Sequence, residues 1–170
     1  MENHRSLEDK IKALEKPQLQ ELISELIRKS RDCKKLTYMW LGDTEKVNEE
    51  LIQEYWSNAA EIIYEFNELG GGPEEKEEEA YEWLEDISQL LKTGSLSSEA
   101  RQYFIDDAMV EYQKQNSGFG DQLMDLFFEA CESDEDWEFL IQKLKEKPSE
   151  WNLKLIEEIY GKHLSKKKTS

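Results

Sequence analysis

Apolar residues recur every three or four positions along most of the chain, the spacing that places them on one face of an α-helix. The clearest apolar stripe is Leu19, Leu22, Ile23, Leu26 and Ile27. Pro17 precedes this stripe in the first helical turn, where proline is tolerated. A short helix from Leu7 is expected before it. A third helix is expected to follow Ser30 and to end at Gly42.

Four Gly and Pro residues at 70–73 interrupt the middle of the chain. The pattern predicts a long helix from Thr44 to this break, followed by a helix that starts in the acidic run at 74–79. Another helix is expected after Ser97 or Ser98, with Tyr103 among its inward residues. The 70–73 segment is the one stretch whose composition suggests a flexible loop.

Three more helices are expected in the last third of the chain. They begin at Asp121, at Ser133 or Asp134, and at Pro148 or Ser149. We therefore predict an all-α protein of about nine helices, arranged as an antiparallel helical array or an α-solenoid-like repeat. We expect one helical domain over 1–164 and a disordered basic tail over 165–170.

Composition supports the helical prediction. The chain has 170 residues, of which 38% are hydrophobic and 36% charged, with 5 Trp, 7 Tyr and 6 Phe. This aromatic content is typical of a folded chain rather than a disordered one. With only 8 Gly and 3 Pro, the sequence lacks the turn residues of an all-β fold.

Charge is distributed unevenly along the chain. The formal net charge is −17, made of +2 over 1–42, −23 over 43–140 and +4 over 141–170. A net negative charge of this size repels a phosphate backbone, so no direct nucleic-acid binding is expected. The acidic middle is either a solvated exterior or a surface that binds a basic protein segment.

The sequence also predicts where the protein works. The N-terminal residues contain no apolar signal region, and no stretch resembles a membrane span, so a cytoplasmic protein without membrane contact is expected. Cys33 and Cys131 are widely separated and belong to no CxxC motif. We expect two buried, reduced thiols on apolar stripes, and no zinc site.

Motifs for catalysis are missing from the sequence. The window 43–54 has the length of an EF-hand loop, but Val47 and Asn48 stand where a ligand and a glycine are needed. The acidic pairs at 106–107 and 134–136 are interpreted as surface and helix-cap residues. No nucleotide-binding or hydrolase motif occurs. We therefore predict no catalytic, cofactor or metal residues and no enzymatic activity.

Two stretches carry a family resemblance. They are Leu14–Ile23, and a longer stretch that runs from Asn116–Asp121 through Asp136–Leu140 to Trp151–Leu155. Their Leu, Trp and acidic patterning resembles the helical-repeat region found beside SWIM-type zinc fingers in uncharacterised prokaryotic proteins. The finger itself needs a Cys-x-Cys and a Cys-x-His, which this chain lacks. The resemblance implies a helical scaffold for protein contacts.

These observations lead to two functional hypotheses. The first is a non-enzymatic helical-repeat scaffold for protein–protein interaction. Its candidate aromatic anchors are Trp40, which ends a helix beside Gly42, and Trp56, which flanks its stripe rather than centring it. Trp83, Trp137 and Trp151 are instead expected in the core. The alternative is an acidic regulator or nucleic-acid mimic that binds a basic partner. Its candidate contact residues are Glu74, Glu75, Glu77, Glu78 and Glu79.

Overall fold

The computed structural model describes residues 5–42 and 44–164. Over these ranges the chain is all-α, which confirms the predicted fold class and the approximate number of helices. The helices are α1 (Leu7–Lys12), α2 (Lys16–Lys29), α3 (Arg31–Leu41), α4 (Thr44–Leu69), α5 (Glu74–Thr93), α6 (Ser98–Lys114), α7 (Gly120–Ala130), α8 (Asp134–Glu146), α9 (Glu150–Ile159) and a π-helical turn, η1 (Tyr160–Leu164). The predicted tail at 165–170 lies outside the described residues.

The chain divides into two compact units, an N-terminal unit (Met1–Val47) and a C-terminal unit (Asn48–Ser170). The sequence predicted one domain over 1–164, and this stays a prediction. The two units differ in how they are built. In the described part of the N-terminal unit, α1, α2 and α3 contain no buried residue, whereas α5 to α9 each bury several.

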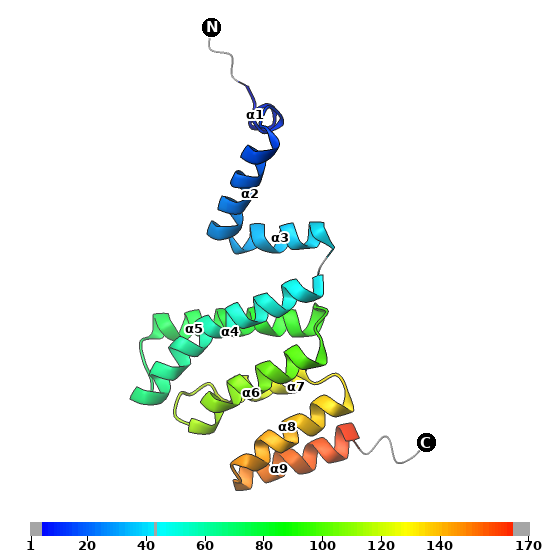
Figure 1. Ribbon diagram of the computed structural model, residues 1–170. Coiled ribbons are helices and arrows are strands. Elements are labelled where there is room, and N and C mark those ends of the chain that lie inside the picture. The colour runs from blue at the N-terminus through cyan, green and yellow to red at the C-terminus, as the bar shows by residue number, and fades with distance from the viewer. Residues whose placement is uncertain (1–4, 43, 165–170) are drawn as a thin grey trace. The chain divides into compact units, whose positions relative to one another are not determined.

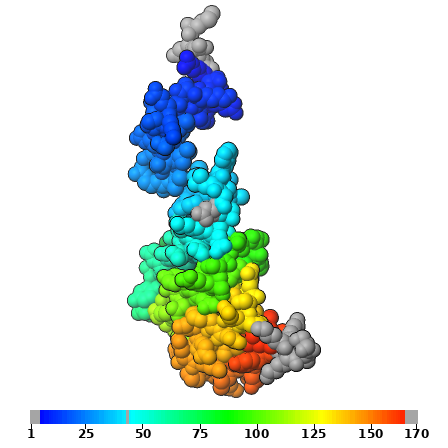
Figure 2. Space-filling view, turned by 45° about the vertical axis from the view of Figure 1, so that its right-hand side comes forward, coloured from blue at the N-terminus to red at the C-terminus, as the bar shows by residue number. Residues whose placement is uncertain are grey.

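The C-terminal unit consists of helices that reverse direction at each turn (Figure 1). Helix α5 packs on α7, α6 packs on both α7 and α8, and α8 packs on α9. Figure 2 shows neighbouring colours side by side over this unit, as expected when each helix packs on helices close to it in sequence. The antiparallel order agrees with the predicted array, and the α-solenoid-like repeat stays a prediction.

Side-chain caps explain where several helices begin. The hydroxyl oxygens of Ser97, Ser133 and Ser149 accept hydrogen bonds from backbone N–H groups three residues later, at 3.1, 3.2 and 3.0 Å. Gly42 ends α3 in the left-handed conformation, with φ 74°, that glycine adopts easily. These are boundaries that the sequence predicted.

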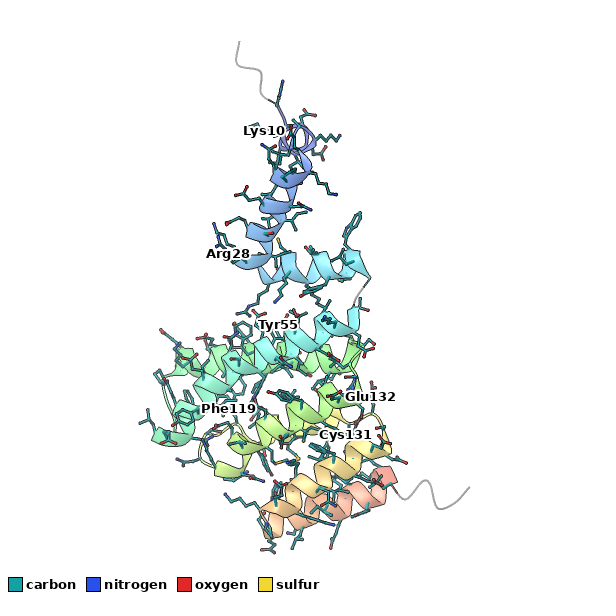
Figure 3. All side chains as sticks on the ribbon, viewed as in Figure 1. Lys10, Arg28, Tyr55, Phe119, Cys131 and Glu132 are labelled. Atoms are coloured by element: carbon teal, nitrogen blue, oxygen red, sulfur yellow. The ribbon has the colours of Figure 1, made fainter. Side chains whose placement is uncertain are left out.

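Aromatic side chains from several helices form the core of the C-terminal unit. The Phe127 ring of α7 lies 6.4 Å from Phe104 and 5.6 Å from Tyr112, measured between ring centroids. Phe119, which precedes α7, contacts Phe66 from α4 at 5.5 Å (Figure 3). These contacts stabilise by apolar burial, and the Phe127–Tyr112 pair also has edge-to-face geometry.

The sequence predicted where the helices lie more accurately than it predicted which side chains are buried. Trp137 is buried as expected and Trp83 is half-buried. Trp151 and Tyr103 were expected to face the core, but 59% and 58% of their surface is exposed. Both predictions are wrong, because each residue lies at the edge of its helix's apolar stripe and the neighbouring helices do not cover it.

The glycine-rich break at 70–73 is a defined turn. The N–H groups of Gly70 and Gly71 both donate to the carbonyl oxygen of Phe66, at 2.8 and 3.0 Å. Gly72 packs on the Phe66 ring so closely that an added Cβ would lie 2.4 Å from a ring carbon. Glycine is therefore needed here for close approach, not only for the flexibility that the sequence suggested.

Candidate interaction sites

The two predicted aromatic anchors have opposite environments. Trp40, at the end of α3, is 90% exposed, the environment expected of a contact residue. Trp56 is only 4% exposed. Its indole N–H donates to Asp107 Oδ2 at 2.7 Å, and its ring meets Phe104 edge-on at 5.7 Å. The hypothesis that Trp56 anchors a partner is therefore wrong, because this side chain joins α4 to α6 within the core.

The predicted acidic run forms the first turns of α5, where carboxylates interact favourably with the helix dipole. Glu74, Glu75, Glu78 and Glu79 are exposed and Glu77 is half-buried. Lys76 pairs with Glu79 at 3.1 Å, and this hydrogen bond and charge raise the pKa of Lys76. The run therefore has a structural role at the helix start, and its charge remains available on the surface.

A groove of about 480 Å³ lies between α5 and α7. The two helices run in the same direction, since Tyr81 meets Phe119, just before α7, at 5.2 Å, while Lys92 pairs with Glu129 near the end of α7. The lining side chains repeat at helical spacing, so each helix presents one face. They are Tyr81, Glu82, Leu84, Glu85, Ser88 and Lys92 from α5, and Gln122, Asp125, Leu126 and Glu129 from α7.

Four carboxylates and one ammonium group make this groove strongly acidic. Glu85 accepts a hydrogen bond from Gln89 at 3.0 Å, and Lys92 lies 3.4 Å from Glu129 Oε1. Within the described ranges, the side chains of Glu82 and Asp125 make no hydrogen bond or ion pair. The groove therefore has three carboxylates that are not neutralised by a cation from the described residues.

Two oxygen atoms in the groove are buried without a donor. Gln122 Oε1 and Glu129 Oε2 are the buried side-chain atoms that have no hydrogen-bond partner in the part of the chain the structure describes. Both residues line the α5–α7 groove. They are seven positions apart on α7, which is about 10 Å along the helix axis. An unpaired buried acceptor costs about 1 to 3 kcal/mol, so a rearrangement of either side chain that brings its oxygen to a donor is favoured.

Tyr81 closes one end of the groove. Burial raises its pKa, and the negative charge of Glu77 and the hydrogen bond to it act in the same direction. The hydroxyl therefore stays neutral and donates to Glu77 Oε1 at 3.5 Å. The groove thus has an aromatic ring at one end and the Lys92–Glu129 pair at the other.

Arg101 supports the end of α7 that carries Glu129. This arginine is 1% exposed, and its guanidinium donates to the carbonyl oxygens of Leu96 at 3.4 Å and Ala130 at 3.2 Å. It also pairs with Glu132 at 2.9 Å. Glu132 and Cys131 lie together just after α7 (Figure 3). A buried arginine was not predicted, because charged residues are usually exposed.

Asp136 is a second buried charge in this region. It completes a capping box with Ser133, and its carboxylate accepts hydrogen bonds from Ser98 and from Gln102 at 3.1 Å. Burial opposes ionisation, but these hydrogen bonds, with those from the Glu132 and Ser133 N–H groups, outweigh it and lower the pKa of Asp136. The interpretation of 134–136 as a helix cap is consistent with this geometry.

Both cysteines are free and half-buried rather than fully buried. Cys131 is the C-cap residue of α7, so it lies one position beyond the helix on whose apolar stripe the sequence placed it. Burial raises the pKa of Cys131, with a further contribution from the charge of Asp136. The ring of His163 stacks on the ring of Trp137, with 3.9 Å between the centroids.

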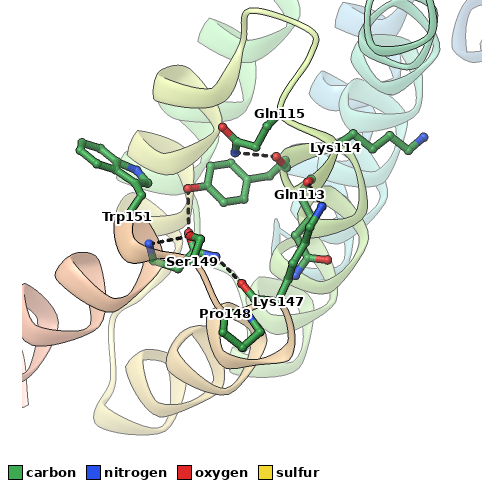
Figure 4. A pocket seen from close by; sticks show the side chains of 9 residues that line it. Gln113, Lys114, Gln115, Lys147, Pro148, Ser149 and Trp151 are labelled. Carbon is green, nitrogen blue, oxygen red and sulfur yellow. Dashed lines mark hydrogen bonds between the residues drawn. The ribbon is translucent and has the colours of Figure 1, made fainter.

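A second pocket, of about 400 Å³, lies between the end of α6 and the turn before α9. Trp151 and Lys114 lie on opposite sides of it (Figure 4). The buried Tyr112 hydroxyl donates to Asn152 at 3.3 Å, and burial raises the pKa of Tyr112. Asn152 in turn donates to the Lys147 carbonyl at 3.0 Å. The polar groups at the back of this pocket are therefore already paired.

The described residues contain neither a metal-binding cluster nor a membrane-spanning helix. Over 5–42 and 44–164, no three His, Cys, Asp or Glu side chains are grouped so as to hold a metal ion. Among these same residues, no helix has the length and apolar character needed to span a bilayer. No family model, curated protein or solved structure matches the chain. The SWIM-associated resemblance therefore stays a prediction.

Proposed function

We propose that the protein is a non-enzymatic interaction scaffold that binds a basic segment of another protein along the α5–α7 groove. The observation that carries this proposal is a groove that holds unneutralised carboxylates and is lined by two residues, Gln122 and Glu129, each with a buried side-chain oxygen that lacks a donor. Lysine and arginine side chains supply what this groove lacks, which is positive charge together with several hydrogen-bond donors.

The spacing of the groove's acceptors suggests the form of the ligand. The two unpaired oxygens belong to residues about 10 Å apart along α7. A segment in the polyproline II conformation rises about 3.1 Å per residue with three residues per turn, so basic residues three positions apart lie on one side of it, about 9 Å apart, which matches this separation. The floor provided by Leu84 and Leu126 accommodates the apolar stems of those side chains.

Binding of a defined peptide tests this proposal. The probe is a fluorescein-labelled Gly-Ser peptide that carries two lysines three positions apart, measured by anisotropy with the full chain in 20 mM and 500 mM NaCl. Replacing Asp125→Asn and Glu129→Gln removes two charges from the groove. At about 0.5 to 1 kcal/mol each, their loss should raise the Kd roughly fivefold to thirtyfold.

A matched variant controls for net charge. Glu75→Gln with Glu78→Gln removes the same charge from exposed positions in the first turns of α5, and it should change the Kd by less than about twofold. If the peptide does not bind at 20 mM NaCl, the proposed function is wrong. If both double variants weaken binding equally, the peptide binds the acidic surface generally and the groove is not the site.

The net charge of −23 over 43–140 favours a second candidate function, an acidic mimic that occupies the nucleic-acid groove of a basic protein. Such binding spreads over many charges. It therefore predicts that the triple reversal of Glu75, Glu78 and Glu79 to Lys weakens binding more than the groove double variant does. The ratio of these two effects separates the candidates.

A further inference from the structure

Large apolar side chains of α2 and α3 are left uncovered in the N-terminal unit. We refer to them as the α2–α3 apolar face: Leu22, Ile23, Leu26, Leu36, Met39, Trp40 and Leu41. On α2 the first three recur at positions i, i+1 and i+4, and on α3 the next three recur at i, i+3 and i+4, so each set shares one side of its helix. The sequence predicted apolar stripes on both helices, and in the structure these side chains are exposed.

The size of this face matches a protein interface. The seven exposed fractions together equal about four fully exposed side chains. At roughly 200 Å² for each large side chain, this is about 800 Å², the area that one partner contributes to a standard interface. A unit of 47 residues that leaves so much apolar surface in water is too small to be stabilised by its own core.

The net charge of each segment indicates which part of a second copy can cover this face. Residues 1–42 carry 9 basic and 7 acidic residues, so two copies of this segment meet with little net repulsion. Residues 43–140 carry a net charge of −23, so two copies of that region repel one another. The nearly neutral N-terminal segment can therefore form a contact between copies without this repulsion.

We propose that the α2–α3 apolar face is covered by the same face of a second copy, so that two α2–α3 pairs form a symmetric dimer. Helix α2 already packs on α3 within one chain, and two such pairs joined by a two-fold axis are a common way to bury helical stripes. Trp40, the most exposed residue of the face, is an aromatic anchor in this interface.

This proposal goes beyond the proposed function and does not depend on it. A dimer carries two α5–α7 grooves, so a partner with two basic segments binds it more tightly than it binds one copy. The salt dependences of the two interactions are opposite. Salt weakens the binding of a basic peptide, whereas it preserves or strengthens dimerisation by screening the repulsion between acidic regions.

Sedimentation equilibrium of the full chain tests the dimer. The experiment uses 2 to 200 μM protein in 50 mM and 500 mM NaCl, with Leu36→Glu as the disrupting variant and Leu153→Glu as its matched control. Leu36 and Leu153 lie on exposed helix faces and are 59% and 55% exposed. We expect a dimer whose Kd rises at least tenfold in Leu36→Glu, changes less than twofold in Leu153→Glu, and does not rise with salt.

A second variant guards against loss of folding. Trp40→Ala removes apolar surface without adding charge, and it should raise the dimer Kd at least fivefold while the far-ultraviolet circular dichroism stays unchanged. A chain that is monomeric at 200 μM overturns the proposal, as does equal weakening by Leu36→Glu and Leu153→Glu. A monomer whose Tm falls in Leu36→Glu also overturns it, because the face is then covered by other residues of the same chain.

Discussion

Replacing Arg101 tests whether the buried guanidinium holds α6 to the end of α7. In Arg101→Met, the carbonyl oxygens of Leu96 and Ala130 lose the donor that lies 3.4 and 3.2 Å away. Each lost hydrogen bond to a buried charged group is worth about 1.5 to 3 kcal/mol, and the relief of a buried charge offsets part of this. Glu132 adds less than about 1 kcal/mol, because its side chain is 65% exposed.

We therefore expect Arg101→Met to lower the free energy of unfolding by about 3 kcal/mol, or the Tm by roughly 6 to 12 °C. Urea unfolding followed by tryptophan fluorescence measures this, since four of the five Trp residues lie in the C-terminal unit. Arg28→Met is the matched control, because the Arg28 side chain is 68% exposed on α2, and it should cost less than about 0.5 kcal/mol. A loss below about 1 kcal/mol for Arg101→Met would refute the assigned role.

Two further predictions follow from pKa values. The folded state lowers the pKa of Asp136, so its carboxylate stabilises the fold above about pH 4, the unfolded value, and this contribution is lost as the pH falls through the lower folded value. The difference in unfolding free energy between wild type and Asp136→Asn should therefore be larger at pH 6 than at pH 3, and an equal difference would contradict it. Burial raises the pKa of Cys131, so in a Cys33→Ser chain this thiol should react with Ellman's reagent at pH 8 at least a hundredfold more slowly than in 8 M urea; similar rates would show that the thiol is accessible.

Periodicity and capping residues determined the helices well because both are local signals. Ser97 and Ser133 act as caps, each being one of the two candidates that the sequence offered, and Ser149 caps the helix expected to begin at Pro148 or Ser149. Gly42 ends α3 in the expected conformation. Each of these positions depends on residues within one turn of the chain, which is the range over which sequence patterns are informative.

Burial depends on which helices meet, and this is not a local property. The α2 stripe has the same periodicity as buried stripes elsewhere, yet Leu26 remains 45% exposed. Trp56 does not lie at the centre of a stripe, yet Asp107 and Phe104 of α6 enclose it. Periodicity shows which side chains share a face, but it does not show whether another helix covers that face.

The candidate groove could not be predicted from the sequence for the same reason. The carboxylates at Glu82, Glu85, Asp125 and Glu129 recur at helical spacing, which was a usable signal for two acidic faces. Their meeting requires that α5 pack on α7 rather than only on its neighbours in sequence. That pairing depends on contacts such as Tyr81 with Phe119, which join residues 38 positions apart.

Nuclear magnetic resonance of the full chain tests most directly whether a basic peptide binds in the α5–α7 groove. The side-chain amide of Gln122 is a built-in reporter, because its oxygen is one of the two buried acceptors without a donor. During titration with the two-lysine peptide in 20 mM NaCl, we predict that this amide and the backbone amides of Asp125 and Glu129 shift together with one Kd. Shifts confined to 74–79, with the Gln122 amide unmoved at saturation, would contradict the account.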